Sequence, residues 1–254
     1  MVYGLWLSAA GLTANQYRQD LIANNLANVE TSGFKHDLAV FSERLSASRE
    51  PGGEPTASHE ILDRMTGGLF AAPTYTSFEQ GAIEPTRRPL DLALQGQGFF
   101  VVRTDQGVAY TRDGRLHVNS QGELRTVAGD WPVLGENGSP VRIPRDRLDE
   151  VQVTADGVVR VSGAPVAQVS LVDFADRQQL RKRGGNLFVA EAGASQRPAS
   201  ASVVSGAVER STVEPMSTMV AMIEASRAYQ LNATMISLQD GMLGRAANDI
   251  ARLS

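Results

Sequence analysis

The residue types that usually carry catalysis or bind metals are sparse in this chain and are not spaced for either task. The three histidines, His36, His59 and His117, are far apart, and none has His, Asp or Glu partners at ligand spacing. No Gly-x-Ser-x-Gly elbow occurs, and Gly96-Gln97-Gly98 precedes a strand pattern rather than a phosphate-binding helix. We therefore expect no catalytic residue, no bound metal and no cofactor.

Asp91 and Asp113, with Arg112, come nearest to a reactive set. Two carboxylates brought together could share general acid and base roles. Each of them lies in a strand or turn pattern that explains it without catalysis. We assign them to turn and ion-pair roles. A hydrolase whose site is assembled from distant residues stays open as a third hypothesis.

The composition excludes several further kinds of binding site. The 254 residues carry a net charge of −4, contain no cysteine and are 42% hydrophobic, which is enough to bury a core. The lack of cysteine excludes disulfides and thiolate metal sites. The largest basic cluster is Arg181–Lys182–Arg183, so nothing indicates a nucleic-acid surface.

We expect neither a secretory signal nor a transmembrane helix. Met1–Leu12 has no basic flank, and polar residues soon follow it. No run of about 18 apolar residues occurs in the chain. Export from the cytosol would need a route that does not cleave a signal peptide.

The C-terminal segment has the pattern of a helix with two apolar sides. Pro215 suits a first helical turn, where its missing N–H would be unpaired in any case. Residues at alternating spacings of three and four then form a heptad pattern. They are Met219, Met222, Ser226, Tyr229, Ala233, Ile236, Asp240 and Leu243. Val220 and Ile223 widen the apolar surface, so we expect more than one neighbour.

The N-terminal segment follows the same spacing. Its main strip is Tyr3, Leu7, Ala10, Ala14, Tyr17, Leu21 and Asn24, and its second strip is Leu5, Leu12, Ile22 and Leu26. Gly4 and Gly11 weaken this helix by up to about 1 kcal/mol each. Isolated helices of this kind are marginal in water.

From both patterns we expect an assembly interface between subunits. Its predicted members are Leu7, Leu12, Leu21, Leu26, Met219, Met222, Tyr229, Ile236 and Leu243. The alternative is an ordinary intramolecular helix pair that covers one face of a β domain.

The middle of the chain has the pattern of short antiparallel strands. Phe99–Val102 is a buried strand candidate, and Asp156-Gly157 is a hairpin signal between Val151–Val153 and Val158–Val161. Val166–Phe174 reads as one strand, whereas Phe41–Arg49 reads as semi-helical.

The predicted fold class is therefore α+β. N- and C-terminal helices pair as a coiled coil, and an antiparallel β-rich domain is inserted between them. We expect residues 1–30 with 213–254 to form the helical domain, 31–75 an extended connector, and 76–212 the β-rich domain.

Four motifs carry a family resemblance. The first, which resembles the N-terminal signature of bacterial flagellar rod and hook proteins, consists of Asn24, Asn25, Leu26 and Asn28 with Gly33, Phe34 and Lys35. Leu94–Val102 and Tyr110–Gly114 look like core motifs of the rod branch, and Met219–Asn232 resembles the C-terminal motif. The motifs are collinear over essentially the whole chain. The tail Leu243–Asn248 looks more like the proximal-rod type than the distal-rod type.

The resemblance implies a structural subunit of the flagellar rod and not an enzyme. Terminal helices of many subunits would pack as an inner layer, and the β domain would form an outer layer of a shaft that transmits torque. It also implies other copies and neighbouring rod proteins as partners, type III export without a cleaved signal, and a place in the basal body. The competing hypothesis is a β-rich surface binding module whose helical ends dimerise.

Overall fold

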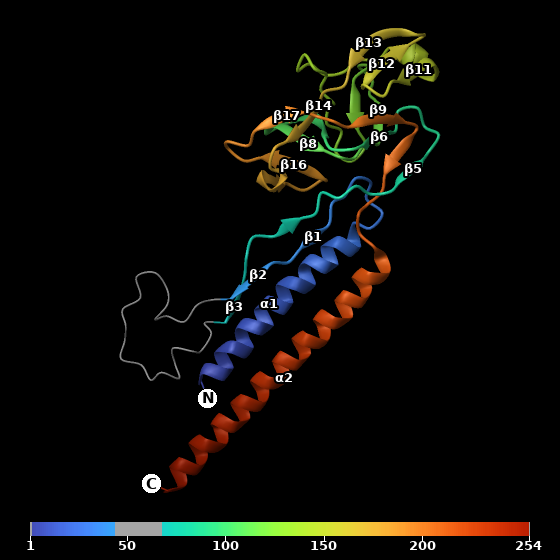
Figure 1. Cartoon of the computed structure of the whole chain (residues 1–254). Coiled ribbons are helices and arrows are strands. Elements are labelled where there is room, and N and C mark those ends of the chain that lie inside the picture. Colours follow the sequence, from blue (N-terminus) through green and yellow to red (C-terminus); the bar gives the residue numbers. More distant parts are fainter. Residues whose placement is uncertain (1, 44–67, 254) are drawn as a thin grey trace. The chain divides into compact units, whose positions relative to one another are not determined.

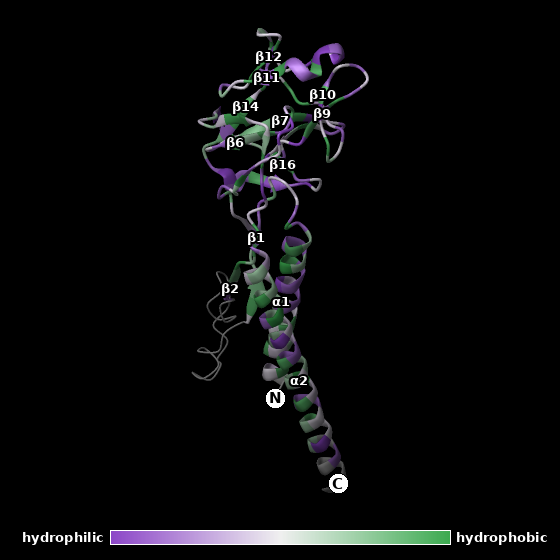
Figure 2. Ribbon diagram, turned by 90° about the vertical axis from the view of Figure 1, so that its right-hand side faces the viewer, coloured by the Kyte–Doolittle hydropathy of each residue, from purple (hydrophilic) through white to green (hydrophobic). Residues whose placement is uncertain are grey.

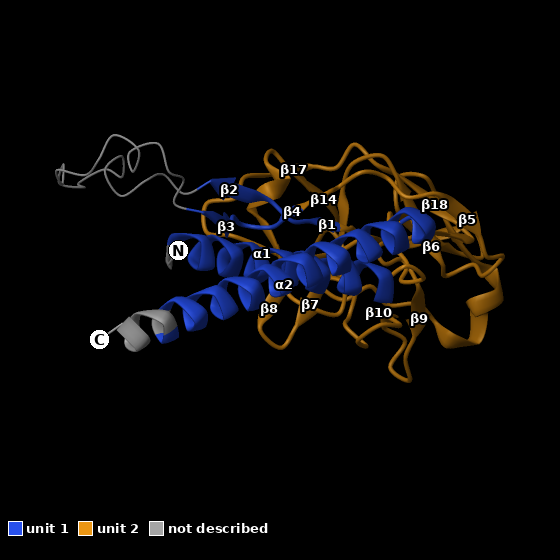
Figure 3. Ribbon diagram, turned by 90° about the horizontal axis from the view of Figure 1, so that it is seen from below, with its two compact units in different colours: residues 1–27, 37–75, 214–254 blue, residues 28–36, 76–213 orange. Residues whose placement is uncertain are grey.

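The computed structural model describes residues 2–43 and 68–253. The chain divides into two compact units, coloured in Figure 3. Unit 1 comprises Met1–Ala27, Asp37–Tyr75 and Glu214–Ser254, and unit 2 comprises Asn28–His36 and Thr76–Val213. The predicted connector of residues 31–75 thus contributes to both units, and its residues 44–67 lie outside the described part.

Two long helices dominate unit 1. They are α1 (Val2–Ala27) and α2 (Pro215–Leu253), which lie side by side in Figure 1. Gly4 faces Gln239 whereas Gly11 faces Asn232, so the residue numbers run in opposite directions and the pair is antiparallel. The predicted fold class is confirmed, since paired terminal helices flank an antiparallel β-rich region.

Short strands complete unit 1, the last of them ending at Thr76, where unit 2 resumes. β1 (Asp37–Leu38) pairs with β4 (Tyr75–Thr76), and β2 (Phe41–Glu43) pairs antiparallel with β3 (Leu69–Ala71). Phe41–Glu43 is thus a strand and not the start of the semi-helical segment predicted for Phe41–Arg49, whose remainder lies outside the described residues. Tertiary contact explains the difference. The Phe41 ring packs edge-on against Tyr17 of α1, with ring centroids 6.5 Å apart.

Unit 2 is built from antiparallel sheets. The largest has the strand order β15-β16-β8-β7-β14-β17. Its strands are β7 (Phe99–Thr104), β8 (Gly107–Thr111), β14 (Leu171–Phe174), β15 (Leu180–Lys182), β16 (Leu187–Ala190) and β17 (Gln196–Pro198). A second sheet has the order β11-β12-β13, with β11 (Val151–Val153), β12 (Val158–Val161) and β13 (Ala164–Gln168). The predicted Asp156-Gly157 hairpin joins β11 to β12.

Three two-stranded pairs surround these sheets. They are β5 (Ile83–Pro85) with β19 (Ala207–Glu209), β6 (Leu92–Gln95) with β18 (Ser202–Ser205), and β9 (Leu116–Val118) with β10 (Leu124–Thr126). Two 3-10 turns, Arg145–Glu150 and Arg177–Gln179, link strands. The segment Val166–Phe174, predicted as one strand, is two strands in different sheets. It breaks at Val169 and Ser170, where the chain passes from one sheet to the next.

Two apolar clusters form the core of unit 2. The larger includes Leu92, Phe100 and Val159, and the smaller gathers aromatic rings around Phe99 and Phe188. These rings meet edge-on or tilted, with Phe99 and Phe188 centroids 5.6 Å apart. Within the described residues, no helix is both long and apolar enough to cross a membrane.

Candidate assembly interface

One side of α2 is covered by α1. Its buried or half-buried positions recur with heptad spacing. The heptad positions are Thr218, Met222, Ala225, Tyr229, Asn232, Ile236, Gln239 and Leu243, and Ala221, Ser226, Ala228 and Ala246 are half-buried beside them. Ala225, near the start of α2, is fully buried. The helix therefore uses one continuous face for its intramolecular partner.

Two glycines of α1 form holes in that contact. A Cβ on Gly4 would lie 3.1 Å from Gln239 Nε2, and one on Gly11 would lie 3.2 Å from Asn232 Nδ2. Both glycines and both amide side chains are seven residues apart, so they repeat with the heptad. Neither Asn232 nor Gln239 belongs to the apolar pattern seen in the sequence. The matching spacing of Gly4 and Gly11 was the signal that could have found them.

The opposite side of α2 carries an uncovered apolar stripe. Val220 is 55% exposed, Leu231 68% and Leu238 57%. The other members are Met216, Met219, Ile223, Met235 and Met242, all exposed. At about 100° per residue, this stripe points away from the face that contacts α1. Figure 2 shows hydrophobic residues recurring along the helix.

The predicted interface residues fall into two groups. Met219 is exposed and lies on the stripe side. The others are half-buried, namely Met222, Tyr229, Ile236 and Leu243 on the covered face of α2, and Leu7, Leu12, Leu21 and Leu26 on α1. Leu7 also lines a hollow of about 300 Å³ with Gly11, Gly68 and Leu69. Most of the predicted residues therefore already have neighbours within unit 1.

The end of α1 is fixed by the Asn25 side chain. Its amide donates to the Asp37 carbonyl at 2.7 Å and accepts from the Asp37 N–H at 3.0 Å. Asn25 is buried, whereas Asn24 is exposed and Leu26 half-buried. In unit 2, the Asn28 side chain accepts from the Thr31 hydroxyl at 3.1 Å. These Asn residues thus replace helix bonding with side-chain contacts at the point where the helix ends.

The Gly33-Phe34-Lys35 part of the motif is buried within unit 2. Gly33 has a φ of +68°, and a Cβ on it would lie 2.4 Å from the Arg112 carbonyl carbon. Only glycine fits such a position. Lys182 lies over the Phe34 ring, 4.1 Å from its centroid. Lys35 is fully buried.

Lys35 and Arg112 share one carboxylate, that of Glu209. Lys35 Nζ lies 2.6 Å from Glu209 Oε1, and Arg112 Nη1 lies 3.1 Å from Glu209 Oε2. Burial lowers the pKa of Lys35 and of Arg112, and the Glu209 carboxylate opposes that shift for both. Sequence reasoning did not find Glu209, since no pattern in the chain links it to Lys35.

Asp113 and Asp91 have the turn and ion-pair settings expected of them. Asp113 forms a two-pronged pair with Arg115, with 2.8 Å between Oδ2 and Nη2, and its Oδ1 accepts from the Arg115 backbone N–H at 3.0 Å. Asp91 lies near Arg88, at 3.8 Å. Arg112 is not part of either pair.

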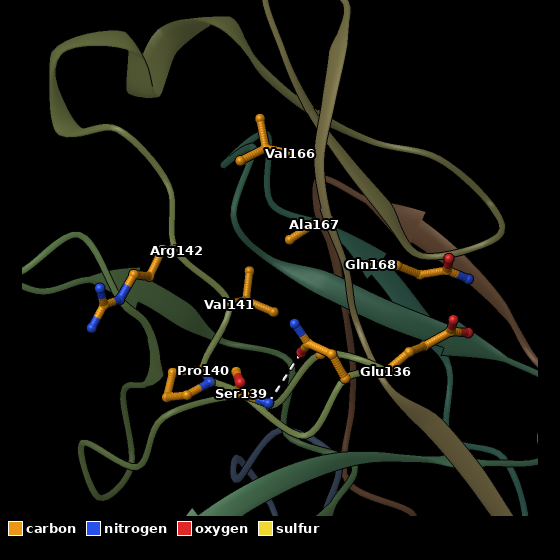
Figure 4. A pocket seen from close by; sticks show the side chains of 10 residues that line it. Glu136, Ser139, Pro140, Val141, Arg142, Val166, Ala167 and Gln168 are labelled. Carbon is orange, nitrogen blue, oxygen red and sulfur yellow. Dashed lines mark hydrogen bonds between the residues drawn. The ribbon is translucent and has the colours of Figure 1, made fainter.

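A surface hollow on unit 2, shown in Figure 4, has no catalytic arrangement. Its volume is about 390 Å³, and its lining includes Val141, Arg142 and Val166. Glu136 is its sole carboxylate, and no histidine lines it. Across residues 2–43 and 68–253, no group of three or more His, Asp or Glu side chains is placed to hold a metal ion.

Three segments match known protein families. Residues 7–35 match "Flagella basal body rod protein", residues 93–161 match "Flagellar hook protein FlgE/F/G D1 domain", and residues 204–249 match "Flagellar basal body rod FlgEFG protein C-terminal". The three matches follow the same order as the motifs found in the sequence.

Full-length relatives agree with these matches. The chain is 34% identical over 266 residues to the flagellar basal-body rod protein FlgG of Borreliella burgdorferi, covering 98% of each chain. It is 31% identical over 263 residues to FlgG of Bacillus subtilis, covering 98% of this chain and 99% of the relative. It is 35% identical over 219 residues to FlgF of Caulobacter vibrioides, covering 85% of each. The chain therefore belongs to the FlgE/F/G family of flagellar basal-body rod proteins.

Proposed function

We propose that this chain is a structural subunit of the flagellar rod, which polymerises through its terminal helices into the axial shaft between motor and hook. The observation that carries the proposal is the pair of apolar faces on α2. One face contacts α1, and the other, with Val220, Leu231 and Leu238, is exposed. A long exposed apolar stripe on a helix is typical of an interaction surface. A structural role of this kind needs no catalytic site.

The proposed partners are other copies of this chain and neighbouring rod proteins. The stripe of one subunit would pack against helices of the next, with Met219 and other methionines adapting to unlike neighbours. The family also supports a place in the part of the basal body that crosses the periplasm. Export through the flagellar type III apparatus, without a cleaved signal, completes the proposal.

Within the family we propose the proximal-rod type, FlgF. The support is the tail Leu243–Asn248, which resembles that type. The distal-rod type, FlgG, is the second candidate, because FlgG relatives match over more of the chain than the FlgF relative does. Complementation separates the two. We expect this chain to restore motility to a strain lacking FlgF and not to one lacking FlgG; the reverse result would favour FlgG.

The general proposal is tested on purified basal bodies. A tagged copy expressed in its own host should copurify with the rod after detergent extraction, and the Leu238→Asp variant should not. A chain that reaches the cell surface but is missing from basal bodies would instead support the β-rich binding module with dimerising helices.

A further inference from the structure

Two segments of unit 2 that are far apart in sequence are hydrogen-bonded to each other. The Gly33 N–H donates to the Glu209 carbonyl at 2.7 Å, and the Thr212 N–H donates to the Phe34 carbonyl at 3.1 Å. The His36 N–H donates to the Thr212 hydroxyl at 3.0 Å. Residues 31–36 thus lie along residues 209–212, at the two ends of the sequence that forms this unit.

The Glu209 side chain also contacts two further segments of unit 2. Its Oε1 accepts from Lys35 Nζ at 2.6 Å and from the Gly81 N–H at 2.9 Å, while its Oε2 accepts from Arg112 at 3.1 Å. A Cβ on Gly81 would lie 2.1 Å from the Arg210 carbonyl oxygen, so this approach needs a glycine. One carboxylate therefore ties together segments that contain residues 35, 81 and 112.

The charges around Glu209 are not balanced without it. Lys35 and Arg112 are both cations, and their remaining hydrogen bonds go to carbonyl oxygens, while Arg112 also lies over the Phe99 ring, 5.5 Å from its centroid. Lys35 donates to the Glu79 carbonyl, and Arg112 Nη2 donates to the Gly96 carbonyl at 2.7 Å. Removing one partner of a buried ion pair leaves a charge that water cannot reach, which is strongly unfavourable. Loss of Glu209 would leave two such charges.

We infer that Glu209 completes the fold of unit 2. Residues 31–36 become ordered only when the C-terminal strand β19, which carries Glu209, is in place. During synthesis Lys35 and Arg112 exist long before Glu209 does. Until β19 arrives, the two cations repel each other and residues 31–36 have no backbone partner in residues 209–212. Completion of unit 2 then depends on residues that come directly before α2. This inference concerns unit 2 alone and does not rest on the proposed assembly through the helices.

Hydrogen exchange measured by mass spectrometry on the full-length protein tests the inference. In Glu209→Gln we expect exchange on the order of a hundredfold faster in residues 31–36, 79–85 and 207–213 together. The β7–β8 hairpin should keep its protection. In Lys35→Met, which leaves Arg112 and Glu209 balanced, only residues 31–36 should exchange faster.

Glu84→Gln is the matched control. It removes a carboxylate from β5, the strand paired with β19, but its ion pair with Arg210 spans 3.6 Å and is exposed. We expect unchanged exchange. The inference is overturned if Glu209→Gln affects residues 207–213 alone or behaves like Glu84→Gln. If Glu209→Gln unfolds the whole unit, the Lys35→Met variant provides the test. Unchanged protection of residues 31–36 in Lys35→Met would also overturn the inference.

Discussion

Gln239 of α2 lies directly over Gly4 of α1, its Nε2 3.1 Å from where a Cβ on that glycine would stand. Asn232 lies over Gly11 in the same way, at 3.2 Å. Polar side chains at heptad positions set the register of a helix pair at some cost in stability. The two contacts therefore fix which residues of the helices face each other, because a shift by one heptad in either direction would leave one of the two glycines facing an alanine, Ala225 or Ala246.

Filling one of these holes should disrupt the pair. We expect Gly11→Leu to destabilise unit 1 by about 1–3 kcal/mol, since the added side chain has no space beside Asn232. Gly241→Leu is the control, because Gly241 lies in α2 and a Cβ on it would have no atom within 4 Å. That change should raise helix stability slightly. Thermal unfolding followed by circular dichroism at about 222 nm, the helix signal, compares them, and equal melting curves would refute the packing argument.

Two substitutions on α2 should separate folding from assembly. Ile236 and Leu238 are two residues apart and point about 200° apart around the helix. Ile236 is half-buried on the covered face, and Leu238 is 57% exposed. We expect Ile236→Asp to cost about 1–3 kcal/mol and to reduce helix content. Leu238→Asp should leave helix content unchanged and abolish incorporation into basal bodies.

The outcome is read from circular dichroism and from motility of cells that carry each variant. Motile cells with Leu238→Asp would show that the stripe is not an assembly surface. Loss of helix content in Leu238→Asp would instead mean that this face is already used within the folded chain.

The paired helices could be predicted from the sequence because the spacing of their apolar residues repeats over many turns. It placed the residues Met222, Tyr229, Ile236 and Leu243 on one line, and these lie on the covered face. It placed the alternate line one residue too far along, at Met219, Ser226, Ala233 and Asp240, because two of the covered positions, Asn232 and Gln239, are polar. From the sequence, Gly4 and Gly11 are only weak helix formers. The facing helix shows that they leave space for the side chains of Gln239 and Asn232.

The contacts of the N-terminal motif could not be predicted from the chain. Lys35 and Glu209 are separated by 174 residues, and no periodic pattern connects them. The hairpin at Asp156-Gly157 was predictable because a two-strand turn depends on neighbouring residues alone. The break in Val166–Phe174 was not, because it depends on which sheet accepts each half.

Gly33 should tolerate no side chain. We expect Gly33→Ala to destabilise unit 2 by about 3 kcal/mol or more, because a left-handed backbone and a clash with the Arg112 backbone add together. Gly138→Ala is the control, since its φ of +71° is similar and nothing lies within 4 Å. That variant should cost about 1–2 kcal/mol, the backbone part alone. Urea unfolding gives both values, and equal costs would show that the close approach to Arg112 is relieved by movement.

Asp173 should make part of the stability of unit 2 sensitive to acid. Burial by itself raises the pKa of Asp173, but hydrogen bonds from Arg177 and Arg197 outweigh it and set the pKa at about 2. The Asp173 carboxylate lies 2.9 Å from Arg177 Nε and 2.7 Å from Arg197 Nη2. A carboxyl whose pKa is lower in the folded state stabilises that state above its unfolded pKa of about 3.9. The contribution is then lost as the pH falls towards 2.

We expect Asp173→Asn to cost about 1–2 kcal/mol at pH 7, a figure reduced for solvent screening because Arg197 is half exposed. The difference between variant and parent should shrink between about pH 4 and pH 2, as the parent carboxyl becomes protonated. Asp105→Asn, at an exposed turn, is the control and should change little at any pH. Urea unfolding at a series of pH values measures all three proteins. A cost of Asp173→Asn that stays constant down to pH 2 would mean that the carboxylate charge contributes nothing and that only the shape of the side chain matters.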